Sequence, residues 1–574
     1  MANPGRTARK LIEYLIRKGP KETARRALLR FGRKRLEKRY VRSLNLPEEE
    51  KELQRRTQFS RKVLFSIAVP LYNTPPELLR ETIASVKEQT YAGWQLCLAD
   101  GSDAAHGDVR EYCEQAARED PRILYRKLDK NGGISENTNA CLEMATGDYI
   151  ALFDHDDLLL PNALYEAAKA VCEKGADFVY SDEIVFESPN REKVIGARFK
   201  PDFSPETLLS NNYICHLTVF SRKLLEKAGP FRKEYDGSQD HDMVLRLTDA
   251  AERIVHIPKV LYLWRAVPTS VASDISSKTY AIEAGRNAVR AFLKERRGMD
   301  AAVESTEAYP TLYRVRYPLE GEPSVHAFIW LGSKEKNAAE RIRALKEKTS
   351  WKNWTVTAVT EEAGRTGRAA ALAEAARNAK EDYLLFTDGI PEALTGDWIE
   401  QLLMFAQQKE IGAVGGKLLF TENSVRHAGV ILGLGEDHLA GRAYYRVDGD
   451  SAGYFGQMAV AGNVSAVTAE CMLVSRAKYE AAGGFPADYT DALFDVDFCL
   501  TLLGMGWRNV YTPFALLRGG KAGRYYLELG KETPSYTADA ALFRKRRKKE
   551  LETGDLYYNP NLSLRYEDYR IAKK

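Results

Sequence analysis

Several features are rare or missing in this 574-residue sequence, and each absence narrows the kind of protein it encodes. Its seven cysteines are scattered, and no two of them form a Cys-x-x-Cys pair. This pattern is typical of reduced thiols and argues against a disulfide framework or a zinc site. No apolar run approaches the roughly 18 residues that a membrane-spanning helix needs, and the first residues show no signal-peptide core. We therefore expect a cytoplasmic protein. No Gly-x-Gly-x-x-Gly follows the first expected strand, which argues against a dinucleotide-dependent dehydrogenase.

Positive charge is concentrated near the N-terminus. Residues 1–46 hold fifteen Lys and Arg against three Glu, whereas the whole chain has a formal net charge of only +4. Leu11, Ile12 and Leu15 belong to an apolar stripe, so residues 1–62 are predicted to be helical, basic and amphipathic. Such a segment is a candidate for contact with the anionic inner face of the cell membrane, and equally for packing on its own protein. No nucleic-acid recognition module accompanies the charge, so we expect no nucleic-acid partner.

The rest of the chain has the pattern of an α/β protein. Its length requires more than one domain, and 44% hydrophobic with 29% charged residues is typical of globular proteins. Short apolar runs alternate with helical patterns from residue 64 onward. The expected strands are 65–71, 94–99, 123–125 and 148–153, and the expected helices between them are 76–89, 109–118 and 135–145. Alternation at this spacing predicts βαβ units and a mostly parallel sheet.

An acidic cluster follows the apolar run 149–153. Asp154, Asp156 and Asp157 lie within four residues, and carboxylates so close together repel one another unless a cation or hydrogen-bond donors neutralise them. Carboxylate oxygens are ligands of Mg²⁺ and Mn²⁺, and open α/β sheets bind ligands beyond the carboxyl ends of their strands. The simpler interpretation is a strand-to-helix turn with an Asp N-cap.

Three further motifs end the other expected strands or open a helix. They are Pro70-Leu71-Tyr72-Asn73, Asp100-Gly101-Ser102, and Asn131-Gly132-Gly133-Ile134 followed by Asn137. Together with the acidic cluster, this ordered series resembles the inverting, nucleotide-sugar-dependent glycosyltransferases of family 2, which have a GT-A fold. The resemblance covers residues 64–298.

The resemblance implies a role for each motif. Asp156, with Asp154 or Asp157, would bind Mn²⁺ or Mg²⁺, and the ion would stabilise the departing nucleoside diphosphate. Tyr72 would stack on the base. Asp100 would hydrogen-bond the base alone, because Ala99 replaces an acidic residue that the family more often has before it. The complete set expected around the donor nucleotide is Pro70, Tyr72, Asp100, Gly132, Gly133, Asn137, Asp154 and Arg265.

A general base is expected at Asp240, just before an apolar helix. By resemblance, its carboxylate would remove the proton of the acceptor hydroxyl, and a single displacement of this kind inverts the anomeric configuration. The polar stretch 180–183 is a candidate lining of the acceptor cleft or an ordinary strand end. Leu263 stands where relatives often carry a His, so we expect a metal site with fewer side-chain ligands.

The pattern repeats in the second half of the chain. Residues 382–388 echo residues 148–154, and a later stretch echoes the surroundings of Asp240. This region resembles the second module of two-domain polysaccharide glycosyltransferases. The candidate site residues of this copy are Asp388, Asp495 and Asp497. Because Asp388 is a lone carboxylate where the first copy has three, we expect a degenerate domain that binds acceptor or a partner.

The alternative for the second copy is a metal-independent transferase in which Arg518, Lys521 and Arg524 hold the diphosphate. The chain as a whole is predicted to contain two tandem GT-A-like α/β domains, at residues 63–300 and 301–574, after the basic segment 1–62. The predicted activity is a metal-dependent hexosyl- or deoxyhexosyltransferase that extends a surface polysaccharide such as O-antigen, capsule or cell-wall glycan.

The predicted partners are a nucleotide-sugar donor and a glycan or lipid-linked glycan acceptor, and the oligomeric state stays open. Two other functions remain as alternatives. A sugar-binding scaffold would need no catalytic residues, yet the first copy keeps its carboxylates. A sugar nucleotidyltransferase would need a Gly-rich basic loop where Pro70-Leu71-Tyr72-Asn73 stands.

Overall fold

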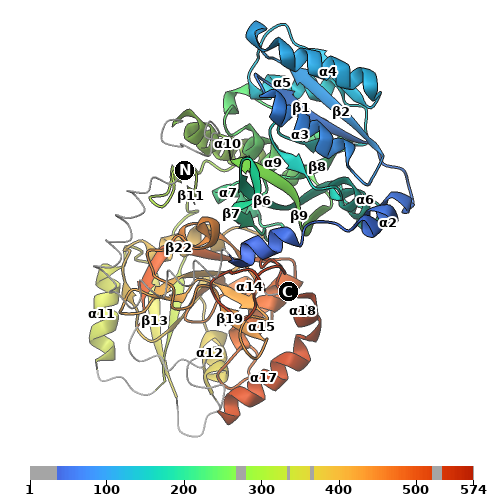
Figure 1. The fold of residues 1–574 in the computed structure, drawn as a ribbon. Helices are drawn as coiled ribbons and strands as arrows, with labels where there is room; N and C mark the ends of the chain where they lie inside the picture. The colour runs from blue at the N-terminus through green and yellow to red at the C-terminus, as the bar shows by residue number, and fades with distance from the viewer. Residues whose placement is uncertain (1–34, 267–278, 333–336, 362–366, 520–532, 573–574) are drawn as a thin grey trace, which may run out of the picture. The chain divides into compact units, whose positions relative to one another are not determined.

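The chain folds into two compact units (Figure 1). The residues that the computed structural model describes are 35–266, 279–332, 337–361, 367–519 and 533–572. The first unit comprises Met1–Phe203, Asn212–Phe292 and Arg570–Lys574, and the second comprises Ser204–Asn211 and Leu293–Tyr569. Both units combine helices with a mixed, largely parallel sheet, which confirms the predicted pair of tandem α/β domains.

Most of the basic N-terminal segment, residues 1–34, lies outside the described part of the chain. Residues 35–42 are helical, and helix α2 (Glu48–Arg56) follows with Glu side chains in its first turn and Arg in its last, an arrangement that suits the helix dipole. No helix within the described ranges combines the length and the apolar composition that a membrane crossing requires.

The described part of the first unit contains a nine-stranded sheet in the order β3-β2-β1-β4-β8-β6-β9-β5, with β7 paired to β6. Its strands are β1 (Phe65–Leu71), β2 (Trp94–Asp100), β3 (Ile123–Lys127), β4 (Tyr149–Leu152), β5 (Leu158–Leu159), β6 (Phe178–Glu187), β7 (Asn190–Arg198), β8 (Thr218–Ser221) and β9 (Ile254–Ala266). Strands β1 to β4 are mutually parallel, whereas β8 runs antiparallel between β4 and β6. Strands β1 and β2 are buried along their whole length, which explains why they read as continuous apolar runs.

Helices connect these strands, and the first three of them lie at the predicted places. The helices are α3 (Pro76–Lys87), α4 (Gly107–Glu119), α5 (Ile134–Met144), α6 (Ala163–Lys174), α8 (Arg222–Ala228), α9 (Gln239–Ala250) and α10 (Thr279–Arg297), with short turns η1 (Ala104–His106) and η2 (Lys233–Tyr235). Helix α3 begins with proline in its first turn, where a missing N–H is tolerated, and buries one apolar face. The predicted βαβ alternation is therefore confirmed.

The second unit has a related sheet in the order β13-β12-β14-β21-β16-β22-β15, with β17 on β16 and β20 on β22. Two pairs of strands, β10 with β11 and β18 with β19, form separate two-stranded sheets. The strands of the whole unit are β10 (Ala302–Ser305), β11 (Tyr313–Arg316), β12 (Val325–Gly332), β13 (Trp354–Thr360), β14 (Tyr383–Asp388), β15 (Glu392–Ala393), β16 (Ile411–Leu419), β17 (Val425–His427), β18 (Val430–Leu432), β19 (Ala440–Arg442), β20 (Gly462–Val464), β21 (Cys471–Ser475) and β22 (Arg508–Arg518). Its helices are α7 (Pro205–Ser210), α11 (Ala338–Lys348), α12 (Gly367–Arg377), α13 (Trp398–Ala406), α14 (Arg476–Ala481), α15 (Phe494–Gly504), α17 (Pro534–Arg546) and α18 (Lys548–Thr553), with the turn η5 (Tyr454–Ala459).

Strand register shows that the two sheets are copies. The order β2-β1-β4-β8-β6-β9-β5 in the first unit corresponds strand by strand to β13-β12-β14-β21-β16-β22-β15 in the second. Tyr149 pairs with Ser221 between β4 and β8, and Tyr383 pairs with Ser475 between β14 and β21. Counting from these pairs, Asp388 occupies the position of Asp154, and Glu470 occupies the position of His216.

Helix α7 belongs to the second unit although its sequence lies within the first domain's stretch. Glu206 on this helix is buried and accepts a hydrogen bond of 2.7 Å from Arg508. Asn463 of β20 accepts a hydrogen bond from the backbone N–H of Glu206 through its side-chain oxygen. These contacts hold α7 against the sheet of the second unit.

Candidate functional site

The acidic turn after β4 is held in place by hydroxyl groups. Thr82 on α3 donates to the carbonyl oxygens of His155 and Asp157, at 3.1 and 2.9 Å. The Thr74 hydroxyl lies 3.1 Å from His155 Nδ1. Because the turn follows β4 directly, it lies at the carboxyl edge of the parallel strands, where the sequence predicts a ligand site.

Asp157 is the buried member of the acidic cluster. Its Oδ2 accepts from the Tyr262 hydroxyl at 2.6 Å, and its Oδ1 accepts from the backbone N–H of Arg265 at 2.6 Å. Burial, followed by the charges of Asp154 and Asp156, raises the pKa of Asp157 well above its usual range. With both oxygens engaged by strand β9, this carboxyl braces the turn.

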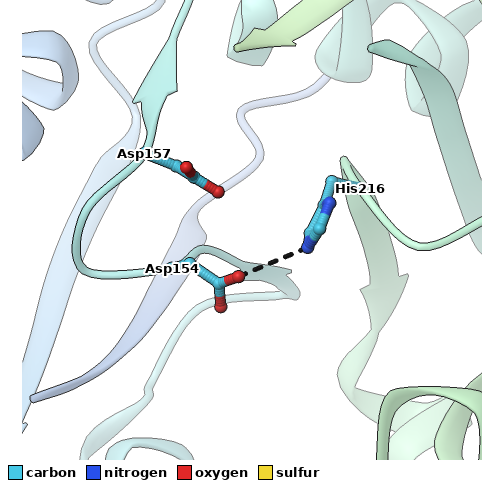
Figure 2. A group of neighbouring side chains, drawn as sticks. All are labelled: Asp154, Asp157 and His216. Atoms are coloured by element: carbon cyan, nitrogen blue, oxygen red, sulfur yellow. Dashed lines mark ion pairs between the residues drawn. The ribbon is translucent and has the colours of Figure 1, made fainter. Parts of the chain in front are cut away.

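Asp154 faces a histidine that the sequence pattern does not single out. Asp154 Oδ2 lies 3.3 Å from His216 Nε2, and the Asp154 side chain is 48% exposed while His216 is nearly buried. Figure 2 shows Asp154, Asp157 and His216 gathered around one point, and one ligand atom from each lies within 4.8 Å of the others. His216 comes from the segment just before β8, about sixty residues after the acidic motif, so no local motif identifies it.

Charge in this cluster is balanced between the carboxylate and the imidazole. Burial opposes ionisation of Asp154, but the His216 hydrogen bond and charge lower its pKa below the ordinary value. Burial likewise lowers the pKa of His216, yet the neighbouring Cys215, Asp154 and Glu183 outweigh it and raise that pKa well above the usual range. Asp154 is thus ionised and exposed to solvent on one side.

Asp156 lies in the same turn but outside the closest group of ligand atoms. Burial raises its pKa, and the charge of Asp154 adds to that effect. Its carbonyl oxygen accepts from Arg265 Nε at 2.5 Å. The prediction that Asp156 is the main metal ligand stays a prediction, with Asp154 and His216 as the pair that the structure brings together.

Arg265 is almost wholly buried. Besides its bond to the Asp156 carbonyl, its guanidinium donates to Glu81 at 2.6 Å and to the Ser188 hydroxyl at 3.3 Å. The residue therefore shapes the acidic turn from strand β9. Contact with a diphosphate stays a prediction, and it would require these internal hydrogen bonds to be exchanged.

Asp240 is the candidate general base. It stands in the first turn of α9, where its Oδ1 accepts from Gln239 Nε2 at 3.0 Å. Burial raises the pKa of Asp240 to about 6, with Asp154 raising it further and His216 opposing the shift. A carboxylate with this pKa is ionised near neutral pH and basic enough to accept a proton.

The predicted base-binding residues lie at the ends of β1 and β2. Tyr72 follows β1 and is 47% exposed, which leaves its ring available for stacking. Asp100 is fully buried at the end of β2, where its oxygens accept from Ser102 N–H and the Tyr125 hydroxyl, each at 2.8 Å. Pro70 lies within buried β1. Tyr72 is thus the exposed member of this group.

The loop before α5 has the backbone that its glycines predict. Gly133 has φ +95°, and a Cβ there would lie 2.6 Å from Asp236 Oδ2. Asn137 is buried; it accepts from Gly132 N–H at 3.1 Å and donates to Asn131 Oδ1 at 2.9 Å. Asn137 therefore fixes the loop from within, and Gly132 and Gly133 leave room at the helix start.

The residues present fit a divalent cation. Asp154 and His216 bring a carboxylate oxygen and an imidazole nitrogen to a common point, and a mixed set of carboxylate and imidazole donors suits Mn²⁺. An imidazole ligand is therefore available in spite of Leu263, from the segment before β8 rather than from β9. The metal site therefore need not have fewer side-chain ligands than in relatives, as the sequence leads us to expect.

The second unit differs most at the corresponding point. Asp388 is buried, with Arg426 NH2 at 3.7 Å and Arg368 NH1 at 3.9 Å. Glu470, at the position of His216, lies 3.1 Å from Arg426 Nε and also pairs with Arg442. Guanidinium groups stand beside these carboxylates where the first unit offers ligand atoms for a cation.

The other predicted residues of the second unit are buried and internally bound. Asp495 accepts from the backbone N–H groups of Ala469 and Val496, both at 2.9 Å. Asp497 pairs with Arg546 at 2.9 Å and with Arg547. Arg518 donates to Glu392 across the β15–β22 pair, whereas Lys521 and Arg524 lie outside the described residues.

Comparisons with known proteins agree with this duplicated architecture. Residues 66–229 match the family Glycosyl transferase family 2, and residues 320–548 match Glycosyltransferase like family 2. The chain belongs to glycosyltransferase family 2, with two such domains in tandem.

Three relatives illustrate the similarity. Protein y4gI of Sinorhizobium fredii is 34% identical over 541 residues, which are 89% of this chain and 58% of that protein. The O-antigen biosynthesis protein RfbC of Myxococcus xanthus is 30% identical over 541 residues, 90% of this chain and 42% of that protein. EpsE of Bacillus subtilis is 31% identical over 225 residues, 38% of this chain and 78% of that protein. The chain thus spans about half the length of the first two relatives.

Proposed function

We propose that the first unit is an inverting, metal-dependent glycosyltransferase that moves a sugar from a nucleotide-sugar donor to a growing surface polysaccharide. The observation that carries this proposal is that Asp154 Oδ2 and His216 Nε2 lie 3.3 Å apart. The charges of both residues also act on the pKa of Asp240, the candidate base. Family membership supports the class of reaction, and the name of the Myxococcus relative supports an O-antigen-like product.

Each residue has a distinct part in the proposed reaction. Asp154 and His216, with Asp156 from the same turn, would hold Mn²⁺ or Mg²⁺, and a bound ion supplies Lewis-acid stabilisation of the departing diphosphate. Asp157 and Arg265 keep the turn in shape. Tyr72 stacks on the base of the donor.

Asp240 accepts the proton of the attacking acceptor hydroxyl. The oxygen then forms its bond to the anomeric carbon as the bond to the diphosphate breaks, and the leaving group takes the bonding electron pair. One displacement on the opposite face inverts the anomeric configuration, and no bond between sugar and protein forms.

The second unit is proposed to have no catalytic role. Its carboxylates at the corresponding position, Asp388 and Glu470, are paired with guanidinium groups rather than arranged around an open point. Arginine charges so close would repel a divalent cation. Binding of the acceptor glycan or of a partner remains the proposed role of this unit.

A donor screen tests the proposal. The purified chain is incubated with UDP-, GDP- and dTDP-sugars, with Mn²⁺, with Mg²⁺ and with EDTA, and release of the nucleoside diphosphate is measured. One donor should be hydrolysed slowly with metal and not with EDTA. Absence of binding and of turnover with every donor would favour the scaffold interpretation.

A further inference from the structure

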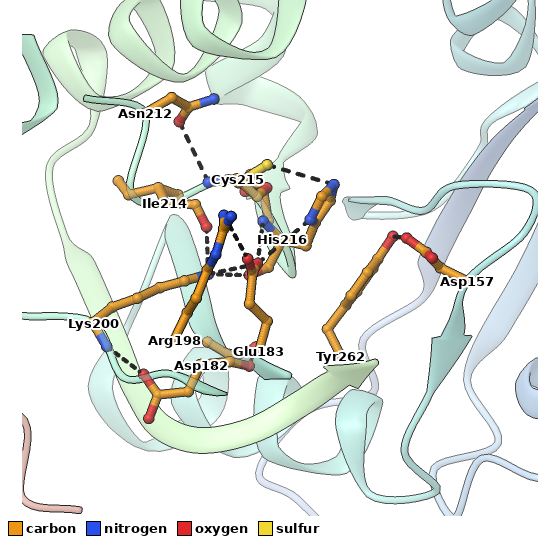
Figure 3. Close-up of polar contacts among 12 residues, drawn as sticks. Asp157, Asp182, Glu183, Arg198, Lys200, Asn212, Ile214, Cys215, His216 and Tyr262 are labelled. Carbon is orange, nitrogen blue, oxygen red and sulfur yellow. Dashed lines mark hydrogen bonds and ion pairs between the residues drawn. The ribbon is translucent and has the colours of Figure 1, made fainter. Parts of the chain in front are cut away.

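A buried group of charges lies directly behind His216 (Figure 3). At its centre is Glu183 of β6, whose side chain is fully buried. Glu183 Oε1 accepts from Arg198 at 3.2 Å, and Oε2 accepts from Lys200 at 3.1 Å and from the backbone N–H of His216 at 3.3 Å. A carboxylate is rarely placed so deep unless it is paired, and here two cations pair with it.

Lys200 ties this group to the segment that carries His216. Besides Glu183, its ammonium donates to the carbonyl oxygen of Ile214 at 2.5 Å and to that of His216. Lys200 is itself buried. The backbone on both sides of Cys215 is therefore held by one cation, and His216 is fixed at its main chain as well as at its ring.

The ring of His216 has one orientation set by its neighbours. Its Nδ1 lies 3.4 Å from Glu183 Oε2, and its Nε2 lies 3.3 Å from Asp154 Oδ2. The ring stacks on Tyr262 with 4.5 Å between centroids and 11° between planes, and it meets Trp264 edge-on. Glu183 and Asp154 thus face the two different ring nitrogens.

We propose that His216 is a ligand of the divalent cation through Nε2, and that Glu183, supported by Lys200, is a positioning residue that holds it there. The inference rests on the proposed function of the first unit and adds the ligand atom of His216 and the residues that hold it in place. Glu183 Oε2 lies 3.4 Å from Nδ1 without making a hydrogen bond to it, and its charge favours a proton on that nitrogen, so a metal ion would take the place of the proton on Nε2. Metal-binding histidines are commonly oriented in this way.

Residues 180–183 agree with neither interpretation made from the sequence, the lining of the acceptor cleft or an ordinary strand end. It lies within β6, and Asp182 and Glu183 are both buried rather than lining an open cleft. Asp182 provides an internal comparison, since its Oδ1 contacts His256 at 3.0 Å and accepts from Lys200 N–H at 2.9 Å. It is a buried carboxylate on the same strand, paired with His256.

Mn²⁺ binding tests the proposal without reliance on turnover. The full chain is titrated with Mn²⁺ and free Mn²⁺ is measured by electron paramagnetic resonance, for wild type, His216→Ala, Glu183→Gln, Glu183→Asp and the control Asp182→Asn. We expect Glu183→Gln to weaken Mn²⁺ binding about tenfold or more, as loss of an outer-shell partner commonly does. Asp182→Asn should bind as wild type does.

Two further readouts separate positioning from loss of fold. Electron spin echo modulation from ligand nitrogen should be present in the wild-type Mn²⁺ complex and absent in His216→Ala. Glu183→Asp keeps the negative charge between Lys200 and Arg198 but shortens the side chain, so it should remain folded, with a melting temperature above that of Glu183→Gln, and bind Mn²⁺ several-fold more weakly than wild type, because the carboxylate is withdrawn from Nδ1. In donor turnover, Glu183→Gln should need more Mn²⁺ for half-maximal rate, with kcat recovered at saturating Mn²⁺.

The outcomes distinguish this inference from the proposed function. If wild type turns over a donor with Mn²⁺ while both Glu183 variants bind Mn²⁺ like wild type, the positioning role is wrong and the transferase proposal stands. A wild-type complex without nitrogen modulation overturns the ligand role of His216. If wild type binds no Mn²⁺ even with the donor present, metal dependence and this inference fail together.

Discussion

The hydroxyl of Tyr262 donates to Asp157 at 2.6 Å, and the same ring stacks on His216 at 4.5 Å. One side chain of β9 therefore contacts both halves of the candidate metal site, the acidic turn after β4 and the segment before β8. The hydroxyl also accepts weakly from Asp154 N–H, at 3.4 Å. Substitution of Tyr262 therefore tests how much the candidate metal site depends on these contacts.

Tyr262→Phe should keep the stack on His216 and remove the donor to Asp157. A buried carboxyl that loses one partner typically costs about 1–3 kcal/mol of stability. We expect a lower free energy of unfolding for the first unit, measured by urea titration with a probe in that unit. The exposed Tyr280→Phe is the control and should stay within about 0.5 kcal/mol of wild type. Equal stability of Tyr262→Phe and wild type would show that Asp157 does not depend on this bond.

Tyr72→Ala should weaken binding of the donor nucleotide. The ring is 47% exposed at the end of β1, and stacking of a base on an aromatic side chain contributes about 1–3 kcal/mol, or about a five- to 150-fold change in Kd. Tyr72→Phe keeps the aromatic face and should bind as wild type does. Calorimetric titration with the nucleoside diphosphate checks both variants, and an unchanged Kd for Tyr72→Ala would remove this residue from the donor site.

Asp240→Asn should slow transfer strongly without abolishing binding of the donor. The amide keeps the shape of the side chain but cannot accept the acceptor's proton, so kcat should fall about 10²- to 10⁴-fold. Asp495→Asn, at the matching position of α15, is the control and should keep wild-type kcat. A normal kcat in Asp240→Asn, with loss in Asp495→Asn, would place the chemistry in the second unit.

The pH dependence of the reaction should report the same carboxylate. The pKa of Asp240 is raised to about 6 by burial and by Asp154, and the base works only in its ionised form. The rate constant kcat/KM should therefore be level near neutral pH and fall about tenfold per pH unit on the acid side. A bound dication would move the inflection below 6, since positive charge favours the ionised carboxylate. A rate that rises as the pH falls through this range would exclude Asp240 as the base.

Much of the fold of the first unit is readable from the sequence, because its central strands are buried on both faces. Strand β1 spans Phe65–Leu71 as predicted, and β2 extends the predicted 94–99 by one residue to Asp100. The sequence did not predict that α7 belongs to the second unit, because its place depends on contacts with β20 and Arg508, which are more than 250 residues away in the sequence.

The candidate site was predictable only where its residues form local motifs. The acidic turn and Asp240 stand in recognisable stretches, whereas His216 precedes β8 without a neighbouring motif and reaches the site through antiparallel pairing of β8 with β4. Residue type also does not settle a role. Arg265 has the chemistry of a phosphate ligand, yet its hydrogen bonds are made to the turn and to Glu81.

The corresponding carboxylates of the two sheets offer the most direct test of the proposed division of labour. Asp154→Asn and Asp388→Asn change the same position of each copy, one beside His216 and one between Arg368 and Arg426. Metal-dependent donor hydrolysis should be lost in Asp154→Asn and unchanged in Asp388→Asn, with melting temperatures confirming that both variants are folded. Loss in Asp388→Asn and retention in Asp154→Asn would contradict the account.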